Sequence, residues 1–228
     1  MTRAKAIFSF ISSVTVSLLL ALPSHAQQPL STEMEEGDSV PFLKGFAVSV
    51  DLVGPIQRLL GDYGQLEAAL RVNLHDQYFP IVEVGIGNAK HDDVVTHISY
   101  KSTAPYFRLG MDYNLLKDKH DIYRIYGGGR YALSYFKYDI SHPGVIDPIW
   151  KTEVPYGANG VKCHYHWLEF SIGVDAKIWG PFHMGWSVRY RRRLIYDSGS
   201  LGNVWYVPGY GESGKTCLGG TFNLGIDL

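Results

Sequence analysis

The sequence predicts an all-β protein, an antiparallel up-and-down transmembrane β-barrel of about eight strands. Three observations predict it. The chain starts with an export signal, apolar and polar residues alternate with a period of two from residue 45 to the end, and the connections between the alternating segments are long and short in turn. Together they place the chain in the outer membrane of a Gram-negative cell.

Residues 1–26 form the first element, a predicted signal peptide. Arg3 and Lys5 precede an apolar run over 6–22, and Ser24-His25-Ala26 follows Pro23 as a cleavage site. The alternative is an N-terminal anchor, but the run is shorter than the roughly 20 apolar residues of a spanning helix. We therefore expect Sec-type export.

Residues 27–44 follow as a flexible periplasmic lead-in. Glu33, Glu35, Glu36 and Asp38 make this segment acidic and poor in apolar residues, which is typical of disordered chain. A peptide that folds on a partner is the alternative.

Residues 45–228 form the predicted barrel domain. The alternation puts apolar side chains on one face of each segment and polar or small ones on the other. The eight alternating segments cover 46–52, 65–74, 82–87, 107–115, 123–135, 168–178, 182–191 and 218–228.

The connections between these segments orient the barrel. Outer-membrane barrels have short periplasmic turns and longer extracellular loops. We therefore expect both termini in the periplasm and four long loops outside. The long connections are 54–64, 88–103, 139–161 and 197–215, and the short ones are 75–77, 117–121 and 180–181.

The polar rows carry equal numbers of acidic and basic residues, which we expect to line the lumen as a charge network. An eight-stranded barrel is only wide enough for side chains to fill it, and buried charges must pair. A periplasmic lipocalin-like carrier, with its apolar rows inside, is an alternative. The expected network is Asp51, Glu67, Arg71, Glu83, Arg108, Asp112, Arg124, Arg130, Glu169, Asp175, Lys177, Arg189, Arg191 and Asp227.

Aromatic residues gather toward the strand ends, as expected for two girdles at the membrane interfaces. Those near the short turns are Tyr78, Tyr113, Tyr123, Trp179 and Phe182, and those toward the long loops are Tyr135, Tyr190, Tyr196 and Trp205.

These features resemble the small outer-membrane barrels, the OmpA transmembrane domain and OmpX group, over residues 45–228. The run 222–228 resembles the terminal strand that the barrel-assembly machinery reads, although it ends in Leu228 where that strand usually ends in Phe. The resemblance implies that machinery as a partner. The Tyr- and Gly-rich stretches 123–129 and 202–209 are similar to an uncharacterised outer-membrane family of unknown function.

Three clusters could carry chemistry. His97-Ile98-Ser99 has the His-x-Ser spacing of one type of lipid A deacylase, but no Asn-Ala follows the serine, so His97 and Ser99 are weak catalytic candidates. His164 and His166 share a strand face and could hold a metal ion, with Cys163 on the opposite face. Cys163 and Cys217 could form a disulfide after export or stay unpaired.

The basic run 189–193 predicts a lipid contact. Arg189 and Arg191 should face the lumen, and Arg192 and Arg193 are candidates for contact with lipopolysaccharide phosphates. The alternative is a positive cap on the end of the strand.

These observations favour a structural or surface-interaction protein with a closed lumen, an unidentified extracellular partner and no cofactor. A lipid A-modifying enzyme is the other alternative. The net charge of −1 argues against a nucleic-acid partner.

Overall fold

The computed structural model describes residues 41–146, 149–202 and 204–228. The predicted signal peptide and all of the lead-in except 41–44 lie outside these residues. Of those four, Leu43 and Lys44 already belong to the first strand.

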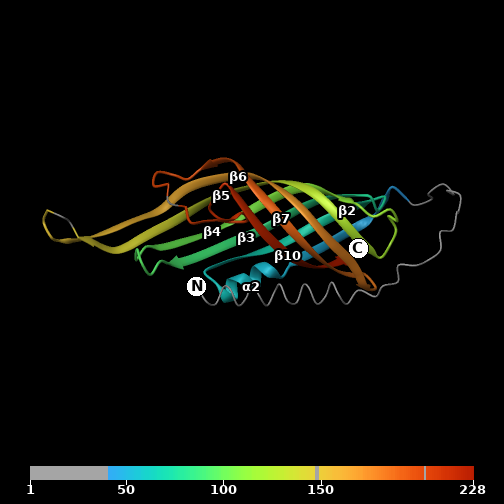
Figure 1. Cartoon of the computed structure of the whole chain (residues 1–228), viewed down its shortest axis with the longest axis horizontal. Helices are drawn as coiled ribbons and strands as arrows, with labels where there is room; N and C mark the ends of the chain where they lie inside the picture. Colours follow the sequence, from blue (N-terminus) through green and yellow to red (C-terminus); the bar gives the residue numbers. More distant parts are fainter. Residues whose placement is uncertain (1–40, 147–148, 203) are drawn as a thin grey trace. The chain divides into compact units, whose positions relative to one another are not determined.

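Eight antiparallel strands close into a barrel, which confirms the predicted fold class (Figure 1). The ring runs in the order β1-β10-β7-β6-β5-β4-β3-β2, and β1 closes it by pairing with β10 from Ala47–Asp227 to Asp51–Asn223. Closure leaves no unpaired sheet edge. The strands are β1 (Leu43–Asp51), β2 (Tyr63–Leu74), β3 (Tyr78–Asp92), β4 (Ser99–Asn114), β5 (Tyr123–Ile146), β6 (Glu153–Trp179), β7 (Phe182–Asp197) and β10 (Thr216–Asp227).

Two of the predicted long loops are largely strand. The β3–β4 ladder continues to Asp92–Ser99, and the β5–β6 ladder continues to Ile146–Glu153. The long β5–β6 hairpin, yellow in Figure 1, extends beyond the neighbouring strands. The alternation weakens in these segments because polar residues occupy both strand faces, so the sequence pattern underestimates the strand length.

The other two long connections contain regular structure of their own. Helix α2 (Val53–Leu60) follows β1, and the Asp51 carboxylate accepts hydrogen bonds from the amides of Val53 (3.1 Å) and Gly54 (3.0 Å) at its start. Strands β8 (Tyr206–Val207) and β9 (Gly211–Glu212) form a two-stranded sheet between β7 and β10.

Large apolar side chains cover the outer wall of the barrel and are exposed. This wall is the reverse of a soluble barrel, which turns such rows inward. Examples from around the ring are Val48, Leu70, Val84, Ile86, Leu109, Met111, Ile125, Phe170, Ile172, Val174, Val188 and Ile226.

None of the described helices is long and apolar enough to cross a membrane.

Most of the predicted interface aromatics lie exposed near the strand ends, among them Trp179 and Phe182, which stack beside the β6–β7 turn. Trp205 does not. Its indole stacks on the His91 ring at 4.2 Å and packs against Tyr63, so its placement in an outer girdle is wrong. The connection that carries Trp205 folds against the barrel, which its sequence pattern does not reveal.

Candidate functional site

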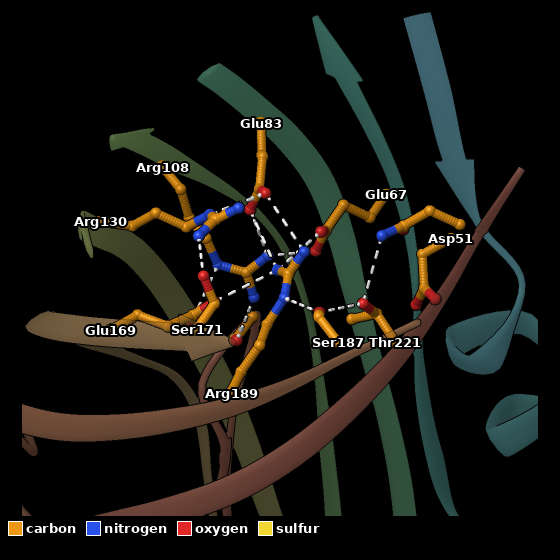
Figure 2. A network of polar contacts seen from close by, with 12 residues as sticks. Asp51, Glu67, Glu83, Arg108, Arg130, Glu169, Ser171, Ser187, Arg189 and Thr221 are labelled. Atoms are coloured by element: carbon orange, nitrogen blue, oxygen red, sulfur yellow. Dashed lines mark hydrogen bonds and ion pairs between the residues drawn. The ribbon is translucent and has the colours of Figure 1, made fainter. Parts of the chain in front are cut away.

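The middle of the lumen holds a buried network of guanidinium and carboxylate groups (Figure 2). Arg108, Arg130 and Arg189 all contact Glu83, and the side chains of these four residues are at most 2% exposed. The Glu83 carboxylate accepts from Arg130 Nε at 2.9 Å, from Arg189 Nη1 at 3.0 Å and from Arg108 Nη1 at 3.1 Å. The Glu83 carboxylate thus links its own strand, β3, to β4, β5 and β7.

Strand register builds part of this network. Glu83 lies directly opposite Arg108 across β3 and β4, and Glu169 lies opposite Arg130 and Arg191 across its two neighbouring strands. Each of these residues alternates with outward apolar residues, so it must point inward. Cross-strand pairing of opposite charges therefore follows from the sequence once the register is fixed.

Arg189 contacts residues that are not its direct cross-strand partners. Its guanidinium crosses the lumen to Glu67 at 3.0 Å and reaches Glu169 at 3.2 Å. Glu67 is also paired with Arg108 and accepts a hydrogen bond from the Tyr106 hydroxyl at 2.6 Å. The ion pairs therefore reach across the lumen and do not merely coat its wall.

A second cluster lies toward the short turns. Asp175 pairs with Arg124, with Arg71 at 2.8 Å and with His183 at 3.0 Å. His183 is the one member that the sequence reasoning did not include, although its position on the polar row of β7 was a usable signal.

Three predicted network residues lie elsewhere or bind other groups. Lys177 and Asp227 are about half exposed and form a 3.6 Å ion pair with each other. Asp51 is buried, but it binds the backbone amides at the start of α2 and the Phe222 amide at 3.1 Å. These positions are near strand ends, where an inward row reaches water or a loop.

Residues 204–212, here called the plug, fold into the barrel at its long-loop end. Tyr206, Val207 and Tyr210 are at most 1% exposed. Arg108 Nη2 donates to the Gly209 carbonyl at 2.7 Å, and Arg191 Nη1 donates to the Tyr210 carbonyl at 2.8 Å. The charge network therefore holds the plug as well as the barrel wall.

Barrel tyrosines and the plug also bind each other directly. The Tyr100 hydroxyl donates to the Tyr206 carbonyl at 2.8 Å. Burial raises the pKa of Tyr210 to about 12, so its hydroxyl stays protonated and donates to the Gly214 carbonyl at 3.0 Å. The predicted long connection 197–215 is present between β7 and β10, but it is not an open loop, because its plug residues are buried in the barrel.

The other candidate residues do not assemble into a reactive site among the described residues. His97 lies in the β3–β4 turn with a φ of 54°, and Ser99 opens β4 opposite Asp92. No hydrogen bond joins His97 to Ser99 in the described part of the chain.

His164 and His166 lie on the outer face, as partners of tyrosines on β5. His166 Nδ1 lies 2.8 Å from the Tyr131 hydroxyl and its Nε2 lies 3.3 Å from the Tyr135 hydroxyl. Among the described residues no group of three or more His, Cys, Asp or Glu is placed to hold a metal ion.

Cys163 and Cys217 are free thiols on β6 and β10, which are separated by β7. The sequence left open whether the two cysteines form a disulfide or stay unpaired, and in the structure they are unpaired.

Arg192 and Arg193 differ in exposure. Arg192 is exposed on the outer face of β7. Arg193 is half-buried and lies over the Tyr196 ring, with Cζ 3.7 Å from the ring centroid. Arg193 is thus engaged by an aromatic ring.

Comparisons with known proteins give one family. Residues 6–227 match the family described as a domain of unknown function (DUF6048). No curated protein matches the chain. The chain is similar to a solved structure of Ail, the attachment invasion locus protein of Yersinia pestis, in complex with the heparin analogue sucrose octasulfate. The identity is 10%, the TM-score is 0.36, and the match covers 80% of this chain and 93% of that chain.

Proposed function

This chain belongs to the family described as a domain of unknown function (DUF6048), and we propose that it is an outer-membrane protein with a closed lumen and a structural or surface-interaction role. One observation carries the proposal. Apolar side chains are exposed around the whole outer wall, while the charges of the same strands are buried inside. In water such a wall would cost much free energy, whereas the hydrocarbon core of a membrane accommodates it.

The buried network supports a role other than transport through the lumen. Glu67, Glu83 and Glu169 are each neutralised by two or more guanidinium groups. The plug then occupies the mouth above them. Because residues of the chain itself occupy the lumen, we expect partners to bind the outer wall and the exposed ends of the barrel.

The orientation follows from loop length. We place the three short turns in the periplasm and the long β5–β6 hairpin outside the cell, because outer-membrane barrels keep short turns on the periplasmic side. Export through the predicted signal peptide and insertion by the barrel-assembly machinery are part of the same proposal.

The test is membrane fractionation combined with heat-modifiable gel mobility. We expect the mature protein in the outer-membrane fraction, with an unheated band that migrates differently from the boiled one because the closed barrel resists detergent. A soluble periplasmic protein would contradict the proposal and favour the lipocalin-like carrier.

The lipid A-modifying enzyme has a separate test. Lipid A from cells that lack the protein should have the same mass spectrum as lipid A from cells that have it. A changed acylation pattern that Ser99→Ala reproduces would support the enzyme instead.

A further inference from the structure

A groove of about 540 Å³ runs along the outer wall across β2, β3, β4 and β5. Its floor and sides are almost entirely apolar, and all of the strands that form it are parts of the membrane-facing wall. We call it the β2–β5 groove. Its lining includes Ala68, Val84, Pro105, Phe107, Leu133 and Tyr135.

A proline explains why the wall is hollowed here. The β4–β5 ladder is interrupted between the pairs Ser102–Tyr138 and Tyr106–Ser134, and Pro105 lies in this gap. Proline has no N–H to donate to the neighbouring strand. The Pro105 carbonyl instead accepts a hydrogen bond from the Ser134 side chain at 3.1 Å.

Two lysines lie directly beyond the end of the groove. Lys137 follows Tyr135 by two residues, so both point outward from β5, and Lys162 is its cross-strand partner on β6. Both lysines are exposed, and neither ammonium group forms an ion pair or hydrogen bond with another residue in the described part of the chain.

Like charges directly opposite each other destabilise a sheet. An anion between Lys137 and Lys162 would remove this repulsion. The nearest acid on the same face of β5, Asp139, lies opposite Lys101 and accepts from the Gly160 amide at 2.7 Å. The Asp139 carboxylate forms no ion pair with Lys137 or Lys162 in the described part of the chain.

We propose that the groove and the lysine pair form one binding site for a phosphorylated lipid of the outer leaflet. One acyl chain lies in the β2–β5 groove, and a headgroup phosphate lies between Lys137 and Lys162. An apolar channel that ends at paired cations matches an amphiphile with an anionic head. This inference rests on the proposed function, since it requires the outer wall to face lipid.

The test is native mass spectrometry of the refolded protein in detergent micelles, titrated with bisphosphorylated lipid A and with the same lipid after dephosphorylation. We expect retention of one lipid, with roughly tenfold preference for the phosphorylated form, because each of two exposed ion pairs strengthens binding by up to about fivefold. Lys137→Gln/Lys162→Gln should abolish that preference.

The groove is tested with two matched variants. Val84→Trp fills the groove, and Val188→Trp makes the same change on β7, outside the groove. The two valines are similarly exposed, at 52% and 58%. Val84→Trp should weaken binding of both lipids by roughly tenfold, because the acyl chain loses buried apolar area, and Val188→Trp should leave binding unchanged.

The double lysine variant has a control that removes the same charge elsewhere. Lys117→Gln/Lys151→Gln alters two exposed lysines away from the groove and should keep the preference for phosphate. The site would be overturned if both double lysine variants lost the preference for phosphate equally. It would also be overturned if Val84→Trp and Val188→Trp weakened lipid binding equally. A protein that inserts in the outer membrane but holds neither lipid would overturn the site alone, and one found in the periplasm would overturn the proposed function as well.

Discussion

The charged residues on the inward rows differ greatly in burial, and we expect their contributions to stability to differ accordingly. Glu83 is 1% exposed and faces three guanidinium groups, whereas the Lys177–Asp227 pair is about half exposed. Breaking a buried pair leaves an uncompensated charge in a medium of low dielectric constant, and an exposed pair is screened by water.

Glu83→Gln should therefore destabilise the barrel by about 3–5 kcal/mol, because it leaves Arg108, Arg130 and Arg189 without their shared carboxylate. Lys177→Gln should cost at most about 1 kcal/mol. Equilibrium urea unfolding in lipid vesicles measures both variants. A Glu83→Gln cost as small as that of Lys177→Gln would show that the network does not stabilise the fold.

The carboxyl of Asp76, in the β2–β3 turn, should make the stability of the folded protein depend on pH. Burial raises the pKa of its carboxyl, but hydrogen bonds from Lys44, His120 and Asn73 outweigh burial and leave the pKa below the usual 3.8. A group whose pKa is lowered by folding stabilises the protein above the unfolded pKa, and this stabilisation is lost as the pH falls through the folded pKa.

We therefore expect Asp76→Asn to be less stable than the unmodified protein at neutral pH. The difference should shrink as the pH falls below 3.8. Thermal unfolding of both proteins across this pH range measures it. A difference that stays constant with pH would mean that the carboxylate charge is not what stabilises the turn.

Among the elements, the plug depends on a close approach to the barrel wall. Gly209 has a φ of 81°, in the left-handed region that favours glycine. A Cβ at this position would lie 2.4 Å from the Tyr106 ring, so any larger residue pushes the plug away from the wall.

Gly209→Ala should therefore expose the plug to protease. We expect faster cleavage within 204–215 in vesicles that hold the protein in one orientation. Gly214→Ala is the control, because its added Cβ would meet only the Thr216 carbonyl at 3.4 Å, an ordinary contact. Equal cleavage of the two variants would contradict the docking of the plug.

At the scale of the whole molecule, two features cross the lumen, the plug at one end and the charge network in the middle. The ion pairs between Glu83 and its three arginines involve no plug residue, although Arg108 also donates to the Gly209 carbonyl. We therefore expect the network to persist when the plug is removed.

Planar-bilayer recordings test this arrangement. The intact protein should conduct no more than the protein-free bilayer, and replacing 204–212 with a short linker should lower stability without creating steady channels. Stable conductance in the deletion variant alone would assign closure to the plug and not to the charges.

The sequence by itself determined the number of barrel strands and the face of each strand that carries charge. These features depend on a period of two, which is local and can be read from a few consecutive residues. Cross-strand partners such as Glu83 and Arg108 followed only from the register. The lengths of the strands could not be predicted as well, because the ends of β5 and β6 have polar residues on both faces.

Only the tertiary structure decided which charges meet across the lumen, where the plug lies, and that the outer wall has a groove. Arg189 reaches Glu67 across 122 residues of sequence, and Arg108 binds the Gly209 carbonyl across 101. Such contacts depend on barrel closure and on the docking of a connection, and neither leaves a periodic signal in the chain. The alternation specifies which face of each strand points inward, but only closure of the barrel brings strands on opposite sides of the lumen within hydrogen-bonding distance.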